Sequence, residues 1–112
     1  MPQPINYDEI ISRLVQKTEE GKISWSQVFS SNTFTCTVEG EFTFRIAKWV
    51  QQEETFVRLS MTDKENNEIF QVEQDVDYAL GRKLSDLHEA ARRVALNVEE
   101  KINAAKDILG RI

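Results

Sequence analysis

Residues 33–46 read TFTCTVEGEFTFRI, and this stretch decides the fold. Apolar residues occupy every second position on both sides of Glu39-Gly40-Glu41, with threonines or Arg45 between them. Alternation with a period of two, around a short glycine-containing turn, is typical of a β-hairpin with one buried face. The stretch therefore predicts two antiparallel strands.

Further strands are expected on both sides of this hairpin. Residues 55–62 alternate in the same way, residues 68–74 follow a polar turn, and residues 23–29 resemble a short strand. We therefore predict an antiparallel meander of three to four strands with one face against the core. The side chains expected on the inner face are Phe34, Cys36, Val38, Phe42, Phe44, Ile46, Val57, Leu59 and Met61.

Helices are predicted before and after the meander. Asn6 followed by Glu9 is a variant of the capping box, and Gly21 ends the helix that these residues begin. Apolar residues recur every three or four positions over 84–109, which predicts one long amphipathic helix with Ser85 near its start as N-cap. At about 1.5 Å per residue this helix would be about 39 Å long and would overhang a small sheet.

The predicted architecture is one two-layer α+β domain over residues 1–112. An N-terminal helix and a long C-terminal helix enclose the meander in sequence, and the long helix packs on one sheet face. A chain of 112 residues, 40% hydrophobic and 29% charged, can bury a core without disulfides. We expect no membrane span, since no apolar run is long enough, and no signal peptide in residues 1–9. A single cysteine fits a reducing compartment, so a cytoplasmic protein is expected.

The net charge of −5 is concentrated in one segment. Residues 53–79 hold eight acids and two bases, for −6, whereas residues 1–52 sum to −1 and residues 80–112 to +2. This asymmetry favours a basic protein partner and argues against binding to duplex nucleic acid. The alternative interpretation is an acidic, solvated hairpin without a partner.

The sequence contains no motif for catalysis or cofactor binding. A single histidine and a single cysteine exclude His-pair and multi-cysteine metal sites, and no glycine-rich phosphate loop is present. We expect His88 at the edge of the core and Cys36 as a small buried hydrophobic residue. The prediction is therefore a protein that is not an enzyme and has no cofactor.

The outer face of the predicted sheet is the best candidate for a binding surface. Tryptophan and arginine are enriched at the centres of protein interfaces, and a basic aromatic sheet can also stack single-stranded bases. Alternatively, Trp49 lies beyond its strand and folds back over the core, while the arginines pair with nearby acids. The residues predicted for this face are Thr33, Thr35, Thr37, Thr43, Arg45, Trp49, Phe56, Arg58 and Ser60.

These patterns favour a non-catalytic, acidic protein-interaction module comparable to inhibitors, immunity proteins and anti-defence accessory proteins. One alternative is an accessory protein for single-stranded nucleic acid, although the chain has no RNP-like pattern and its net charge is negative. Another is a structural homodimer formed through the overhanging C-terminal helix. The residues predicted to bind the partner are Arg45, Trp49, Phe56 and Arg58 on the sheet, with Glu53, Glu54 and Asp75 in the acidic segment.

Overall fold

The structure is a computed structural model that describes residues 4–112, so the first three residues of the N-terminal stretch considered above lie outside it. The predicted α+β class is confirmed, with five strands rather than three or four because residues 23–29 contribute a short first strand. The elements in chain order are α1 (Tyr7–Glu19), β1 (Ser26–Gln27), β2 (Thr33–Val38), β3 (Phe42–Gln51), β4 (Glu54–Asp63), β5 (Glu68–Asp75), α2 (Ala79–Ala95) and α3 (Val98–Leu109).

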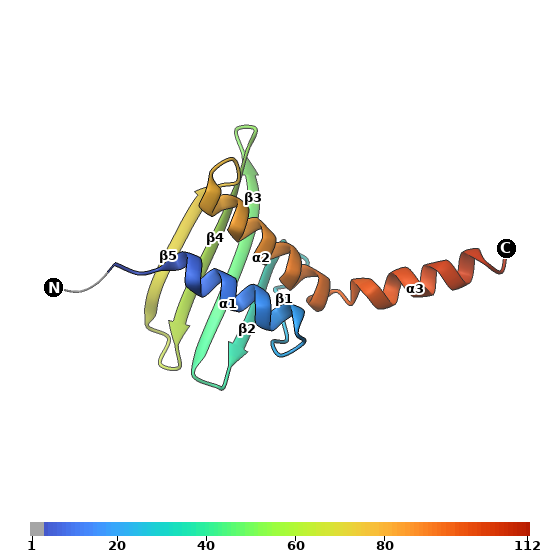
Figure 1. Cartoon of the computed structure of the whole chain (residues 1–112), viewed down its shortest axis with the longest axis horizontal. Helices are drawn as coiled ribbons and strands as arrows, with labels where there is room; N and C mark the ends of the chain where they lie inside the picture. Colours follow the sequence, from blue (N-terminus) through green and yellow to red (C-terminus); the bar gives the residue numbers. More distant parts are fainter. Residues whose placement is uncertain (1–3) are drawn as a thin grey trace.

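The five strands form one antiparallel sheet whose spatial order is β1-β2-β3-β4-β5, the same as their order in the chain. Figure 1 shows α1 and α2 lying across the same face of this sheet. In the hairpin of β2 and β3, Val38 pairs with Phe42. The turn between them uses positive φ angles at Glu39 (56°) and Gly40 (67°), as a tight hairpin turn requires. The hairpin predicted from residues 33–46 is therefore confirmed.

The hydrophobic core lies between the inner face of the sheet and the two helices. Helix α2 contacts all five strands, and α1 packs beside α2. Eight of the nine side chains predicted to face inward are buried or half-buried, whereas Phe42, at the start of β3, is 40% exposed. The fully or nearly fully buried hydrophobic residues are Ile11, Leu14, Trp25, Phe34, Cys36, Ile46, Val57, Leu59, Phe70, Leu84, Leu87 and Ala91.

Hydrogen bonds at both ends of α1 fix its position. The side chain of Asn6 accepts a hydrogen bond from the backbone N–H of Glu9 at 3.1 Å, as the capping pattern predicts. At the other end the indole N–H of Trp25 donates to the hydroxyl of Thr18 at 2.9 Å. That hydroxyl in turn donates to the carbonyl of Leu14 at 2.6 Å. A buried tryptophan therefore joins the last turn of α1 to the segment that leads into β1.

Helix α2 begins seven residues earlier than the Ser85 N-cap predicts. It starts at Ala79, and the side chain of Ser85 accepts a hydrogen bond from Lys48 at 3.1 Å instead of capping the helix. The prediction of Ser85 as N-cap is therefore wrong. The start of α2 is set by tertiary packing, because Gly81 lies directly against the backbone of Asp75 at the end of β5.

The predicted single helix over 84–109 is divided in two. Asn97 adopts the left-handed conformation (φ 52°, ψ 46°), and the backbone N–H groups of Leu96 and Asn97 donate to the carbonyls of Arg92 and Val94. This arrangement ends α2, since an αL residue after the last turn satisfies the free carbonyls. Leu96, just before this residue, is half-buried against the core.

Of the two C-terminal helices, only α2 therefore packs on the sheet, as predicted for the long helix. Helix α3 buries no residue, and Figure 1 shows it projecting away from the rest of the molecule. Within residues 4–112, no helix combines the length and the apolar character needed to cross a bilayer.

Candidate functional site

The outer face of the sheet is the surface that no helix covers. Both α1 and α2 lie on the opposite face (Figure 1). The strand register places the predicted residues together: Trp49 pairs with Phe56, Arg45 with Ser60, and Arg58 lies between Ala47 and Glu73. The alternative in which Trp49 lies beyond its strand is wrong, because β3 continues to Gln51 and includes it.

An aromatic–arginine cluster occupies one end of this face and consists of Trp49, Phe56, Arg58 and Glu73. The rings of Trp49 and Phe56 are stacked with centroids 6.0 Å apart and an interplanar angle of 26°. The guanidinium of Arg58 lies 5.0 Å from the centroid of the Trp49 ring, a distance typical of a cation–π contact. The same guanidinium donates to one carboxylate oxygen of Glu73 from Nε (3.0 Å) and Nη2 (2.9 Å).

These contacts restrict side chains that would otherwise rotate freely. Each ring and the guanidinium has at least one neighbour on an adjacent strand, so the cluster presents a defined shape. The pairing of Arg58 with an acid was foreseen, but Glu73 itself was not predicted as a site residue. The alternation of residues in β5 places Glu73 on the outer face, but it identifies Glu73 as the partner of Arg58 only when the register between β4 and β5 is known.

A second feature of the outer face is a hollow around Arg45, which we name the Arg45 hollow. Its volume is about 290 Å³. Arg45 is exposed, and within the described residues no acidic side chain forms an ion pair with it. The guanidinium is therefore available to a carboxylate or another anionic group of a ligand. The residues that line the hollow are Thr43, Arg45, Ser60, Thr62 and Asn66.

The predicted acidic residues lie at the Trp49 end of the sheet. Glu53 and Glu54 are at the turn between β3 and β4, where Gln52 and Glu53 have positive φ angles of 52° and 67°. Asp75 pairs with Phe56 on the outer face. The carboxylate of Asp75 also accepts a hydrogen bond from the backbone N–H of Asp77 at 2.8 Å, so this side chain shapes the turn into α2.

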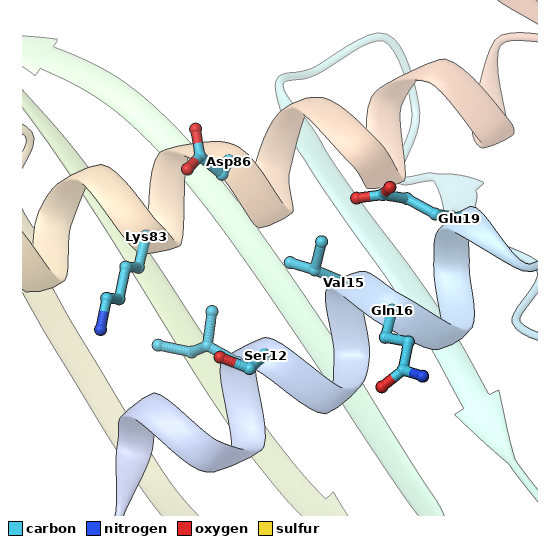
Figure 2. Close-up of a pocket in the computed structure, with 7 residues that line it drawn as sticks. Ser12, Val15, Gln16, Glu19, Lys83 and Asp86 are labelled. Atoms are coloured by element: carbon cyan, nitrogen blue, oxygen red, sulfur yellow. The ribbon is translucent and has the colours of Figure 1, made fainter.

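Another hollow, of about 380 Å³, lies away from the outer face, between α1 and α2. Figure 2 shows that the polar ends of Lys83, Asp86 and Gln16 do not converge on one point. Lys83 instead forms an ion pair with Asp8 at 2.9 Å. The hollow therefore lacks the convergent polar groups that a catalytic site needs.

Two further side chains with reactive groups, Cys36 and His88, are buried in the core. Cys36 is buried, and burial raises the pKa of its thiol to about 12, which keeps it protonated. His88 is 4% exposed, and its Nε2 lies 2.8 Å from the carbonyl oxygen of Asn32, so Nε2 donates the hydrogen bond. Among residues 4–112, no three of the His, Cys, Asp and Glu side chains are grouped so that they could hold a metal ion.

His88 gives the fold a pH dependence that can be measured. Burial lowers the pKa of His88, so the folded protein keeps the imidazole neutral while the unfolded chain binds a proton below about pH 6.5. We therefore expect the free energy of unfolding to be highest above pH 7 and to fall as the pH is lowered from 7 to 5. Urea titrations at pH 5, 6 and 7 measure this slope.

The matched variant for this prediction is His88→Gln, whose side-chain amide can still donate to the Asn32 carbonyl. Over pH 5–7 its stability should change less than that of the natural protein. Equal slopes for the two proteins would contradict the assignment to His88.

The chain matches no protein-family model, no curated protein and no solved structure.

Proposed function

We propose that this protein is a non-catalytic interaction module that binds a partner protein through the outer face of its sheet. The observation that supports this most directly is the aromatic–arginine cluster, a fixed stack of Trp49, Phe56 and Arg58 on a face without a covering helix. Tryptophan, tyrosine and arginine dominate the binding energy of many protein interfaces. Side chains that are already ordered lose less entropy when they bind.

The charges on this face suggest the chemistry of the partner. The Arg45 hollow suits a carboxylate, whereas Glu53, Glu54 and Asp75 make the Trp49 end of the sheet acidic. We propose a partner that offers an acidic side chain to the hollow and basic side chains to the opposite end. Inhibitors, immunity proteins and anti-defence accessory proteins act by such surface complementarity, and we propose this class for the chain. The buried, unpaired Cys36 also fits the proposed cytoplasmic location.

Binding of single-stranded nucleic acid receives less support from the same geometry. The ring of Trp49 already contacts Phe56 and Arg58, and the charge of Arg58 is paired with Glu73. A stacking platform instead needs exposed rings beside unpaired cations.

A tagged pull-down from the native host tests the proposal. Trp49→Ala and Arg45→Glu should each reduce capture of the partner, by on the order of 30-fold in affinity if the residue is a hot spot worth about 2 kcal/mol. Arg13→Glu is the matched control. It changes the charge by the same amount as Arg45→Glu, but on α1, on the other side of the molecule.

Charge reversal at Glu53 and Glu54 tests the acidic end separately, and Asp75 is left intact because its carboxylate shapes a turn. A partner that is captured equally by all outer-face variants would contradict the proposal. A gel shift with single-stranded DNA or RNA at low salt, where charge-driven binding is strongest, tests the nucleic-acid alternative on the same samples.

A further inference from the structure

Beyond Val98, which is half-buried, helix α3 has an apolar face that nothing in the described chain covers. Ile102 is 42% exposed, Leu109 66% and Ile112, just beyond the helix, 94%. A helix of 12 residues is marginally stable in water without tertiary contacts. Contact between its apolar face and a partner surface would therefore stabilise the helix. The residues on this face are Val98, Ile102, Ala105 and Leu109, with Ile112 following at the same spacing.

The spacing of these residues is that of a coiled-coil seam. Successive steps along the chain are 4, 3, 4 and 3 residues, which is the a/d pattern of a heptad repeat. Ile108, 53% exposed, adds an apolar side chain at the adjoining g position. This stripe still suits one neighbouring helix, whereas a helix that packs on a sheet has a wider apolar face. Helix α2, which covers the sheet, half-buries Val94 and Ala95 in addition to the buried Leu84, Leu87 and Ala91.

Residues 4–97 of the same chain offer no such neighbour within reach of α3. Only Leu96 and Asn97 link the helices, so α3 could fold back only onto the solvent side of α2. The exposed side chains there are predominantly charged, and an apolar seam gains little by packing on them. They include Arg82, Lys83, Asp86, Glu89 and Arg93.

The charges beside the seam indicate which helix it fits. Glu99 and Lys106 are seven residues apart and lie on the same flank, at e positions, and Lys101 lies on the other flank at a g position. In an antiparallel pair of α3 helices, Glu99 of each copy lies beside Lys106 of the second copy. A parallel pair would instead place Lys101 beside Lys106 of the second copy, which is repulsive. The antiparallel pair also opposes the two helix dipoles.

We infer that α3 pairs in antiparallel orientation with α3 of a second copy of this chain. Glu99 already pairs with Arg93, but its side chain is 71% exposed and remains open to Lys106 of the second copy. The inference is independent of the proposed function, since α3 and the outer sheet face share no residue.

The size of the seam sets the expected strength of the dimer. Two short helices bury less than the roughly 1,200 Å² at the lower end of stable interfaces. We therefore expect a reversible dimer with a dissociation constant on the order of 100 µM.

Sedimentation equilibrium from about 5 µM to 1 mM, in low-salt buffer, tests this inference. The expected result is a shift from the mass of one chain to that of two across this range. Ile102→Gln should keep the protein monomeric at 1 mM, because it places a polar side chain in the seam. Asn103→Gln is the matched control on the far side of the helix and should dimerise normally.

Charge exchange tests the orientation of the two helices. Glu99→Lys and Lys106→Glu should each weaken the dimer at least 10-fold, whereas the double variant, and an equimolar mixture of the two single variants, should regain it. Each variant should fold like the natural protein, because α3 buries no residue and the substitutions leave the core intact. Circular dichroism checks this.

Three outcomes would overturn the inference: a monomer at every concentration, a dimer that survives Ile102→Gln, or a double variant that fails to regain association.

Discussion

Gly81→Ala is expected to lower the free energy of unfolding by about 3 kcal/mol or more, the largest single-methyl effect in this chain. A Cβ at position 81 would stand 1.8 Å from the carbonyl oxygen of Asp75 and 2.5 Å from its carbonyl carbon. Both atoms belong to the backbone, so no side-chain rotation can relieve the overlap. Either the end of β5 or the first turn of α2 must move, and α2 contacts every strand of the sheet.

Thermal unfolding followed by circular dichroism measures this effect, and the midpoint should fall by about 10 °C or more. Gly110→Ala is the control, because a Cβ there would meet its nearest atom, the carbonyl oxygen of Lys106, at 3.4 Å. Its midpoint should stay close to that of the natural protein. A Gly81→Ala midpoint equally close to the natural value would show that the strand and helix do not meet as described.

Trp25→Ala is expected to cost about 3–5 kcal/mol, the usual range when a large buried aromatic side chain is removed. Trp25 is 4% exposed and is the side chain that fills the space where the chain passes from α1 into β1. Because β1 has only two residues, its strand pairing cannot hold this segment alone. Urea unfolding measures the loss, and a cost below about 1 kcal/mol would contradict the described burial.

The hydrogen bond from Trp25 can be tested separately from its packing. Thr18→Val should cost about 1–3 kcal/mol, since it leaves the buried indole N–H without its acceptor. In the background of Trp25→Phe, which has no N–H, the same substitution should cost less. Equal costs in the two backgrounds would show that the hydrogen bond contributes nothing to stability.

Much of the fold follows from short-range patterns. The hairpin of β2 and β3 is predictable because its alternation and its turn residue, Gly40, agree with each other. The start of α1 is predictable because Asn6 and Glu9 supply a local cap. Residue parity along each strand also places Trp49, Phe56 and Arg58 on the same face before any pairing is known.

The features that were missed depend on contacts between distant parts of the chain. Helix α2 starts at Ala79 because its first turn packs against the end of β5, and its N-terminus has no side-chain hydrogen bond at the cap to signal this. The break at Asn97 is hidden because the apolar spacing continues across it, and asparagine is among the few residues other than glycine that adopt the αL conformation readily. The pairing of Arg58 with Glu73 requires the register of two strands, which alternation alone does not supply.

The order of the strands has a consequence for how the chain folds as it is synthesised. Each strand pairs with the next one along the chain, so the sheet can form from contacts of short sequence separation, which favours rapid formation. Helix α2, which contacts all five strands, is synthesised only after the whole sheet. Until Ala95 has been synthesised, the inner face with Phe34, Ile46 and Leu59 lacks the helix that contacts every strand and is open to aggregation. The interval in which the nascent chain is most open to aggregation is therefore the one before α2 is complete, after the sheet itself can already form.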